Sequence, residues 1–78
     1  MIKVKELVEL LQDSLWLDLI VENGLSLLCE VSHAKHTLKA DSRGELEVPA
    51  NSVYVYEQNI GYAGIYRKCV QVKCTKSI

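Results

Sequence analysis

The feature that most constrains this chain is a change in hydrophobic periodicity after its first twelve residues. Apolar side chains first recur three and four positions apart, as they do on one face of a helix. These residues are Val4, Leu7, Val8 and Leu11. We therefore predict a helix over residues 3–12. A helix this short is marginally stable alone, so its apolar face must pack on another element.

From residue 15 the pattern changes to alternation of apolar and other side chains, which is typical of a β-strand. The apolar positions are Leu15, Leu17, Leu19 and Val21. The Asn23-Gly24 dipeptide that follows is a strong β-hairpin signal. We predict a second strand over Leu25–Val31, antiparallel to the first.

The length of the hairpin loop follows from which side chains it brings opposite each other. A two-residue loop would place Leu17 opposite the charged Glu30. A three-residue loop over residues 22–24 places Leu17 opposite Cys29 and Leu19 opposite Leu27, so that the pairs on the core face are apolar. A one-residue slip reverses the faces of a strand, so we predict the three-residue loop, with its last residue, a glycine, in the left-handed conformation.

The middle of the chain, residues 32–52, has the weakest pattern. Residues 41–44 have the composition of a turn, and we predict short strands on either side of it, at His36–Ala40 and Glu45–Val48. Pro49 lacks a backbone N–H, which predicts a bend or a sheet edge there.

Strand signals return in the last third of the chain. Tyr54 and Tyr56 alternate with valines, so we expect the valines to face the core and the tyrosines to face outward. A loop over residues 58–64 then leads to a last strand over residues 65–74. The side chains expected on one face of that strand are Val70, Val72 and Cys74.

Together these elements predict an α+β fold, in which one N-terminal helix packs on an antiparallel sheet of four or five strands. The chain of 78 residues has the length of one small domain, residues 1–78. Its hydrophobic fraction of 49% and charged fraction of 24% are those of an ordinary globular domain. Nine basic residues against ten acidic ones argue against a dedicated nucleic-acid binder.

The sequence also favours a cytoplasmic protein. None of its apolar runs approaches the roughly 20 residues that cross a bilayer, and charges at Lys3, Lys5, Glu6 and Glu9 interrupt any export signal at the N-terminus. Three cysteines are an odd number and too few for a disulfide-stapled miniprotein. We therefore expect free thiols in a reducing compartment.

Five residues are possible zinc ligands: Cys29, His33, His36, Cys69 and Cys74. Structural zinc sites use short chelating pairs, whereas Cys69 and Cys74 are five apart and point to opposite faces of a strand. We therefore expect no metal and no cofactor, with cysteines in the core and solvated histidines. A zinc-stabilised module remains an alternative.

Motifs for catalysis are weak. The sequence contains no phosphate-binding loop and no G-x-G-x-x-G fingerprint. No cysteine has a glycine-rich oxyanion turn beside it, and the carboxylates are scattered. We expect a protein that is not an enzyme.

The tyrosines are the most informative candidates for binding. All four lie between residues 54 and 66, and every charge after Gln58 is basic. Tyrosine is enriched at interfaces, so we predict a partner-binding region whose candidate residues are Tyr54, Tyr56, Tyr62, Tyr66, Arg67 and Lys68.

Three interpretations of this region stay open. The tyrosines complete the second face of the sheet, they contact a protein or a second copy of the chain, or they stack on single-stranded nucleic acid. The last hypothesis relies on the cations Arg67, Lys68 and Lys73. Trp16 is expected at the edge of the core.

Four segments carry a resemblance to a known group of proteins: VKELVELLQD, LDLIVENG, SVYVYEQNIG and YRKCVQVK. They resemble segments of short α+β proteins encoded by phages and mobile elements of Gram-positive bacteria, and residues 32–49 are not matched. The resemblance implies a binding protein that acts on a host protein in the host cytoplasm. Some small phage proteins inhibit host enzymes such as CRISPR nucleases. The resemblance assigns no functional residue.

Overall fold

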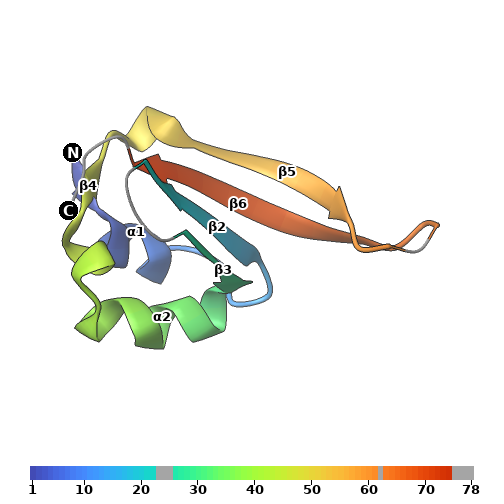
Figure 1. The fold of residues 1–78 in the computed structure, drawn as a ribbon, viewed down its shortest axis with the longest axis horizontal. Coiled ribbons are helices and arrows are strands. Elements are labelled where there is room, and N and C mark those ends of the chain that lie inside the picture. The colour runs from blue at the N-terminus through green and yellow to red at the C-terminus, as the bar shows by residue number, and fades with distance from the viewer. Residues whose placement is uncertain (23–25, 62, 75–78) are drawn as a thin grey trace.

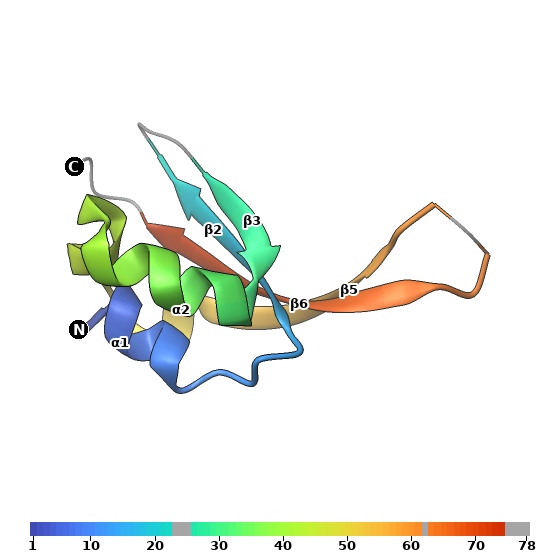
Figure 2. The same cartoon turned by 90° about the horizontal axis from the view of Figure 1, so that it is seen from below.

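A four-stranded β-sheet with two helices on one of its faces forms the structure, a computed structural model that describes residues 1–22, 26–61 and 63–74 (Figures 1 and 2). The helices are α1 (Val4–Glu9) and α2 (Val31–Ala40). The strands of the large sheet are β2 (Trp16–Val21), β3 (Leu27–Glu30), β5 (Val53–Asn59) and β6 (Tyr66–Cys74). The predicted α+β class is confirmed, with one helix more than expected.

The four strands are arranged in the order β3-β2-β6-β5. The outer pairs, β2 with β3 and β5 with β6, are antiparallel hairpins, whereas the two central strands, β2 and β6, run parallel. Parallel neighbours need a crossover connection, and here the chain between them makes it through the helix layer. The expectation that every pair is antiparallel was wrong for this central pair, because alternating side chains look the same in either direction.

The predicted register of the first hairpin is confirmed. Leu17 pairs with Cys29 and Leu19 pairs with Leu27, the two core-face pairs that only the three-residue loop allows. The last two residues of the predicted loop, including the predicted left-handed Gly24, lie outside the described residues.

The core lies between this sheet and the helices, and it is made of the side chains that the alternation placed on one face. The sheet contributes Leu17, Leu19, Val21, Val70, Val72 and Cys74, all of them buried. The helices contribute Val4, Val8, Val31, Ala34 and Leu38. The core-facing positions predicted for the strands now seen as β2 and β6 are therefore confirmed, whereas Val55 of β5, expected to face the core, is exposed.

Helix α1 is shorter than the predicted range of residues 3–12. The backbone N–H of Leu11 donates to the carbonyl oxygen of Val8, 3.1 Å away and only three residues earlier, which tightens the last turn and ends the helix. Leu10 points outward and is 77% exposed, while Leu11 still packs against the core.

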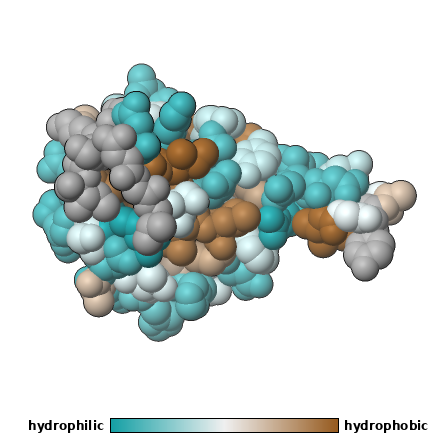
Figure 3. All heavy atoms as spheres, viewed as in Figure 1, coloured by the Kyte–Doolittle hydropathy of each residue, from teal (hydrophilic) through white to brown (hydrophobic). Residues whose placement is uncertain are grey.

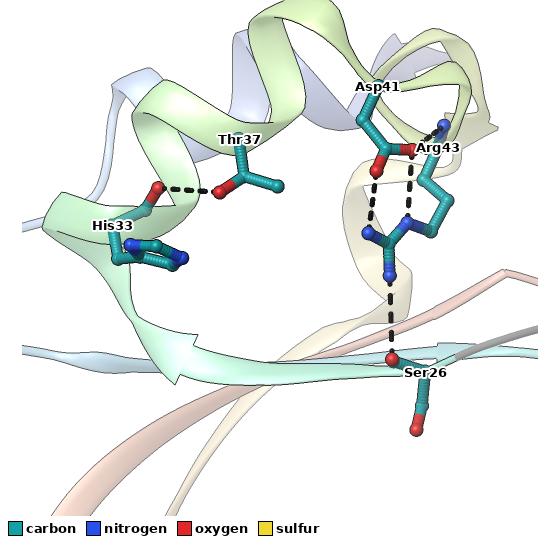
Figure 4. Close-up of polar contacts among 5 residues, drawn as sticks. All are labelled: Ser26, His33, Thr37, Asp41 and Arg43. Atoms are coloured by element: carbon teal, nitrogen blue, oxygen red, sulfur yellow. Dashed lines mark hydrogen bonds and ion pairs between the residues drawn. The ribbon is translucent and has the colours of Figure 1, made fainter.

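The predicted strand at His36–Ala40 was wrong, because this segment belongs to helix α2. Thr37 Oγ1 donates to the carbonyl oxygen of His33 one turn earlier, 3.1 Å away, as helical spacing requires (Figure 4). The reason is tertiary: Val31, Ala34 and Leu38 are spaced three and four positions apart, and burying that stripe against the sheet favours a helix.

A second, two-stranded sheet joins the N-terminus to the middle of the chain. The predicted strand at Glu45–Val48 is reduced to β4 (Glu47–Val48), which pairs antiparallel with β1 (Ile2–Lys3). Between α2 and β4 the chain forms a 3-10 turn, η1 (Ser42–Glu45), and Pro49 then precedes a second one, η2 (Ala50–Ser52). The bend expected at this proline is therefore present.

Gly44 in η1 lies against the end of α2. A Cβ atom added there would clash with the backbone carbonyl oxygen of Leu38 and lie 3.3 Å from Cβ of Lys5. Neither neighbour is the flexible end of a side chain, so the close approach of η1 to both helices requires glycine.

Asp41 and Arg43 connect the end of α2 to the start of β3 (Figure 4). Asp41 Oδ1 accepts from the backbone N–H of Arg43 at 2.8 Å, and Oδ2 accepts from its Nη2 at 2.6 Å. Arg43 Nη1 in turn donates to the carbonyl oxygen of Ser26 at 3.4 Å. The hydrogen bonds from Arg43 lower the pKa of Asp41 to about 2, because they stabilise its ionised form.

We expect Gly44→Ala to destabilise the fold by about 2 kcal/mol, because the added methyl group must displace backbone atoms. The measurement is the free energy of unfolding from urea titration. Ser42→Ala, in the same 3-10 turn but at an exposed position, is the matched control. Equal stability of the two variants would contradict the close packing of Gly44.

We expect acid to weaken the fold through Asp41. Its pKa is lower in the folded state than the ordinary value of 3.8, so this stabilisation is complete above about pH 4 and is lost as the pH falls to about 2. Asp41→Asn should lower the free energy of unfolding by about 1 kcal/mol at pH 7 and show a smaller loss between pH 4 and pH 2. Asp13→Asn, which breaks only an exposed ion pair with Lys35, should change stability less. Parallel curves for Asp41→Asn and the wild type would contradict this role.

Candidate functional site

The face of the large sheet opposite the helices is the candidate site, and we call it the open face. In β2, Leu17 and Leu19 point to the core. Because side chains alternate along a strand, the residues at the intervening positions of β2, and at the matching positions of the other strands, point the other way. The open face consists of Trp16, Asp18, Ile20, Leu28, Glu30, Tyr54, Tyr56, Gln58, Arg67, Cys69, Gln71 and Lys73. The predicted outward direction of Tyr54 and Tyr56 is confirmed.

A hydrogen-bonded network crosses the middle of the open face. Tyr56 Oη donates to Asp18 Oδ2 at 2.8 Å, and Gln71 Nε2 donates to the same oxygen at 3.2 Å. Tyr54 Oη donates to Oε1 of Gln71. Three strands meet in this network because the register places Asp18 beside Gln71 and Gln71 beside Tyr54. Both tyrosine rings are thereby held in fixed orientations.

The hydrogen bond to Asp18 raises the pKa of the Tyr56 phenol above its ordinary value of 10.0. A phenolate beside a carboxylate would be repelled and would lose its hydrogen bond, so the protonated phenol is favoured. Tyr56 therefore remains a neutral donor to Asp18 at physiological pH.

Trp16 and Arg67 form a second cluster on the open face. The guanidinium carbon of Arg67 lies 4.1 Å from the centroid of the Trp16 ring, within the range of a cation–π contact. Nε of Arg67 also donates to Oε1 of Gln58 at 2.7 Å. The expectation that Trp16 sits at the core edge was wrong, because the odd–even alternation of β2 turns it to the side opposite Leu17.

The six residues predicted to bind a partner do not share one surface. Tyr54, Tyr56 and Arg67 lie on the open face. Tyr66 and Lys68 lie on the other side of the β5–β6 hairpin, because even-numbered residues of β6 point to the helix side. The remaining candidate, residue 62, lies outside the described residues.

In the two side-chain clusters of this face, sequence reasoning missed four residues: Trp16, Asp18, Gln58 and Gln71. The alternation of β2 could have placed the first two opposite the core. The contacts of Asp18 with Gln71 and Tyr56 had no local signal, since they depend on the parallel pairing of β2 with β6.

The basic residues of the nucleic-acid hypothesis are also divided. Arg67 and Lys73 lie on the open face, while Lys68 lies on the other side beside Glu57. The carboxylates of Asp18 and Glu30 are on the open face as well. A phosphate backbone that follows this face would meet both charges.

The possible zinc ligands are spread over the molecule. Cys69 is buried beneath the open face and Cys74 in the core, while Cys29 is half-buried and His33 and His36 are exposed on α2. Among the described residues, no three His, Cys, Asp or Glu side chains are grouped so that they could hold a metal ion.

The cysteines Cys29 and Cys74 are not activated nucleophiles. Burial raises the pKa of both thiols, which favours the unreactive protonated form. On the open face Asp18 already accepts from Tyr56 and Gln71. The arrangement is therefore suited to presenting a rigid polar and aromatic surface.

Within residues 1–22, 26–61 and 63–74, no helix has the length and apolar character needed to cross a membrane. Comparison of the chain with protein-family models, with curated proteins and with solved structures found no match.

The link between Tyr56 and Asp18 is testable by titration. We expect one phenol of the wild type to ionise well above pH 10 when absorbance at 295 nm is followed, and Tyr56→Phe to remove this late step. Asp18→Ala should move the step to lower pH, because the carboxylate no longer opposes the phenolate. Circular dichroism at each pH confirms that the fold persists. An unchanged titration of Asp18→Ala would contradict the assignment.

Proposed function

We propose that this chain is a small non-enzymatic binding protein that docks on another protein through its open face. The observation that carries the proposal is the array of Trp16, Tyr54, Tyr56 and Arg67 on a sheet face that no described helix covers. Tryptophan, tyrosine and arginine are the residue types most enriched at the energetic centres of protein interfaces.

The aromatic and arginine side chains of the open face are also held in place before any partner binds. The hydroxyl groups of Tyr54 and Tyr56 and the guanidinium of Arg67 all have partners within the chain. Side chains held in this way lose little conformational freedom when a partner binds, which lowers the entropic cost of association. Tyr54 is nevertheless 55% exposed, so its ring is accessible for contact.

A protein partner fits this face better than single-stranded nucleic acid does. Stacking platforms for nucleic acid combine aromatic rings with a positively charged groove. Here the two carboxylates Asp18 and Glu30 accompany the two cations Arg67 and Lys73. Binding of labelled single-stranded DNA that weakens with salt would instead support the nucleic-acid alternative.

The resemblance to proteins of phages and mobile elements suggests which class of protein the open face binds. We infer from the resemblance that the partner is a host protein in the host cytoplasm, with an enzyme of host defence such as a CRISPR nuclease as one candidate. The net charge of −1 is far from that of a strongly acidic mimic of DNA, so we place recognition in the shape and aromatic content of the open face.

Capture by the immobilised chain from a lysate of a Gram-positive host tests the proposal. We expect Tyr54→Ser and Tyr56→Ser each to weaken binding of the captured protein at least tenfold, measured by titration after its identification. Both variants should keep the wild-type circular dichroism spectrum.

Tyr66→Ser is the matched control, because Tyr66 is equally exposed at 57% but lies on the other side of the hairpin. It should bind the partner as the wild type does. Loss of binding in Tyr66→Ser alone, or unchanged binding in both open-face variants, would refute the open face as the docking surface.

A further inference from the structure

The two edges of the large sheet differ in length and in protection. Strand β3 forms one edge and β5 the other, at the top of the sheet in Figure 1. An unpaired edge presents backbone N–H and C=O groups that can bind another strand, and proteins usually block such edges.

The edge of β3 is short and partly blocked. It has four residues, and the chain turns directly from Glu30 into α2. The N–H of Val31 donates to Leu15 O, so odd-numbered residues bond toward β2 and even-numbered ones face outward. The outward carbonyl group of Ser26 accepts from Arg43 (Figure 4).

The edge of β5 has seven residues and a definite hydrogen-bonding pattern. The N–H of Ile60 donates to Ile65 O at 3.3 Å, which extends the pairing of β5 with β6. Inward and outward groups alternate along an antiparallel strand. The even-numbered residues of β5 therefore bond to β6, and the outward N–H and C=O groups belong to Val53, Val55, Glu57 and Asn59.

Most of the devices that usually protect an edge are missing from β5. Residues 53–59 contain no proline, lysine or arginine, and their pairing with β6 runs without a bulge. The single charge is Glu57, opposite Lys68 of β6. Val55 lies on the helix side of the sheet and is 57% exposed, whereas Val53 on the same side of β5 packs against the core.

We propose that β5 pairs antiparallel with β5 of a second copy of this chain, about a twofold axis through the two Val55 residues. Outward backbone groups can pair only with outward ones, so odd-numbered residues must face odd-numbered residues. The helix sides of both sheets then lie together, and the two sheets join into one with eight strands.

Side-chain complementarity selects the register. Pairing Val55 with Val55 of the second copy buries the exposed valines against each other and places Tyr54 beside Tyr56 of the second copy. The same register places Val53 opposite Glu57 of the second copy on each side of the axis. Moving the axis to Glu57 would oppose two carboxylates, and moving it to Tyr56 would separate the two exposed valines. The first register is therefore the one of these three that brings the two exposed valines together without opposing like charges.

The same pairing brings further apolar surface close to the second copy. The β5–β6 hairpin projects beyond the helix layer (Figure 2), and Figure 3 shows apolar side chains near its outer end, where Ile60 and Ile65 are exposed. Extending the register beyond β5 brings the outer end of each hairpin beside the η2 turn of the other copy. Because of the twofold symmetry, this contact between a hairpin end and an η2 turn occurs twice in the dimer, once on each side of the axis.

Sedimentation equilibrium of the full chain tests the proposal. The wild type should reach twice its mass of 8.8 kDa as concentration rises, and Val55→Lys should raise the dissociation constant at least tenfold by placing two ammonium groups opposite each other. Leu28→Lys makes the same change on the other edge strand and should dimerise as the wild type does. A wild type that stays monomeric, or a Val55→Lys variant that still dimerises, overturns the proposal.

Cross-linking tests the register separately. Under oxidising conditions Val55→Cys should form a covalent dimer, because the two sulfur atoms face each other across the axis, whereas Glu57→Cys should not. Cross-linking of Glu57→Cys alone would overturn the register. Folded, monomeric Val55→Lys should still capture a partner through the open face, so failure of dimerisation and failure of the proposed function give different results.

Discussion

The parallel pairing of β2 with β6 is the contact on which the rest of the structure depends. It joins two hairpins that are separate in sequence into one sheet. On one side it brings Leu17 beside Val70, so that both hairpins share the core with the two helices. On the other side it brings Asp18 beside Gln71, and this proximity allows the hydrogen bonds of the polar network on the open face.

The same alternation serves stability and recognition. The side chains of β2 and β6 that lie beneath the helices are buried and, apart from Cys74, aliphatic, which supplies the hydrophobic stabilisation of a small domain. Those that point away are aromatic, polar and charged, and they bind one another across strands. The Tyr56–Asp18 and Arg67–Gln58 contacts hold rings and charges in place on an accessible face. Rigidity of this kind favours a contact surface, because the entropy of ordering is already lost on folding.

Much of the fold was predictable from periodicity, because burying one face of each element is a local requirement. The pairing of Leu17 with Cys29 followed from matching apolar side chains across a hairpin, and the outward direction of Tyr54 and Tyr56 followed from the valines between them. Helix α2 was not predicted, since its stripe of Val31, Ala34 and Leu38 is sparse and becomes decisive only against a sheet. The clusters on the open face were not predicted either, because the contacts that join β2 to the other strands link residues more than 35 positions apart in the chain.

Local patterns therefore decided which side chains of β2 and β6 face the core, where the two hairpins form and that the fold is α+β. These properties depend on neighbours along the chain, whose spacing can be read directly. Tertiary packing decided the direction of the central strand pair, the helical state of residues 31–40 and the side-chain contacts of Trp16 and Asp18. Those properties depend on which distant segments meet, and alternation alone is equally compatible with a parallel or an antiparallel neighbour.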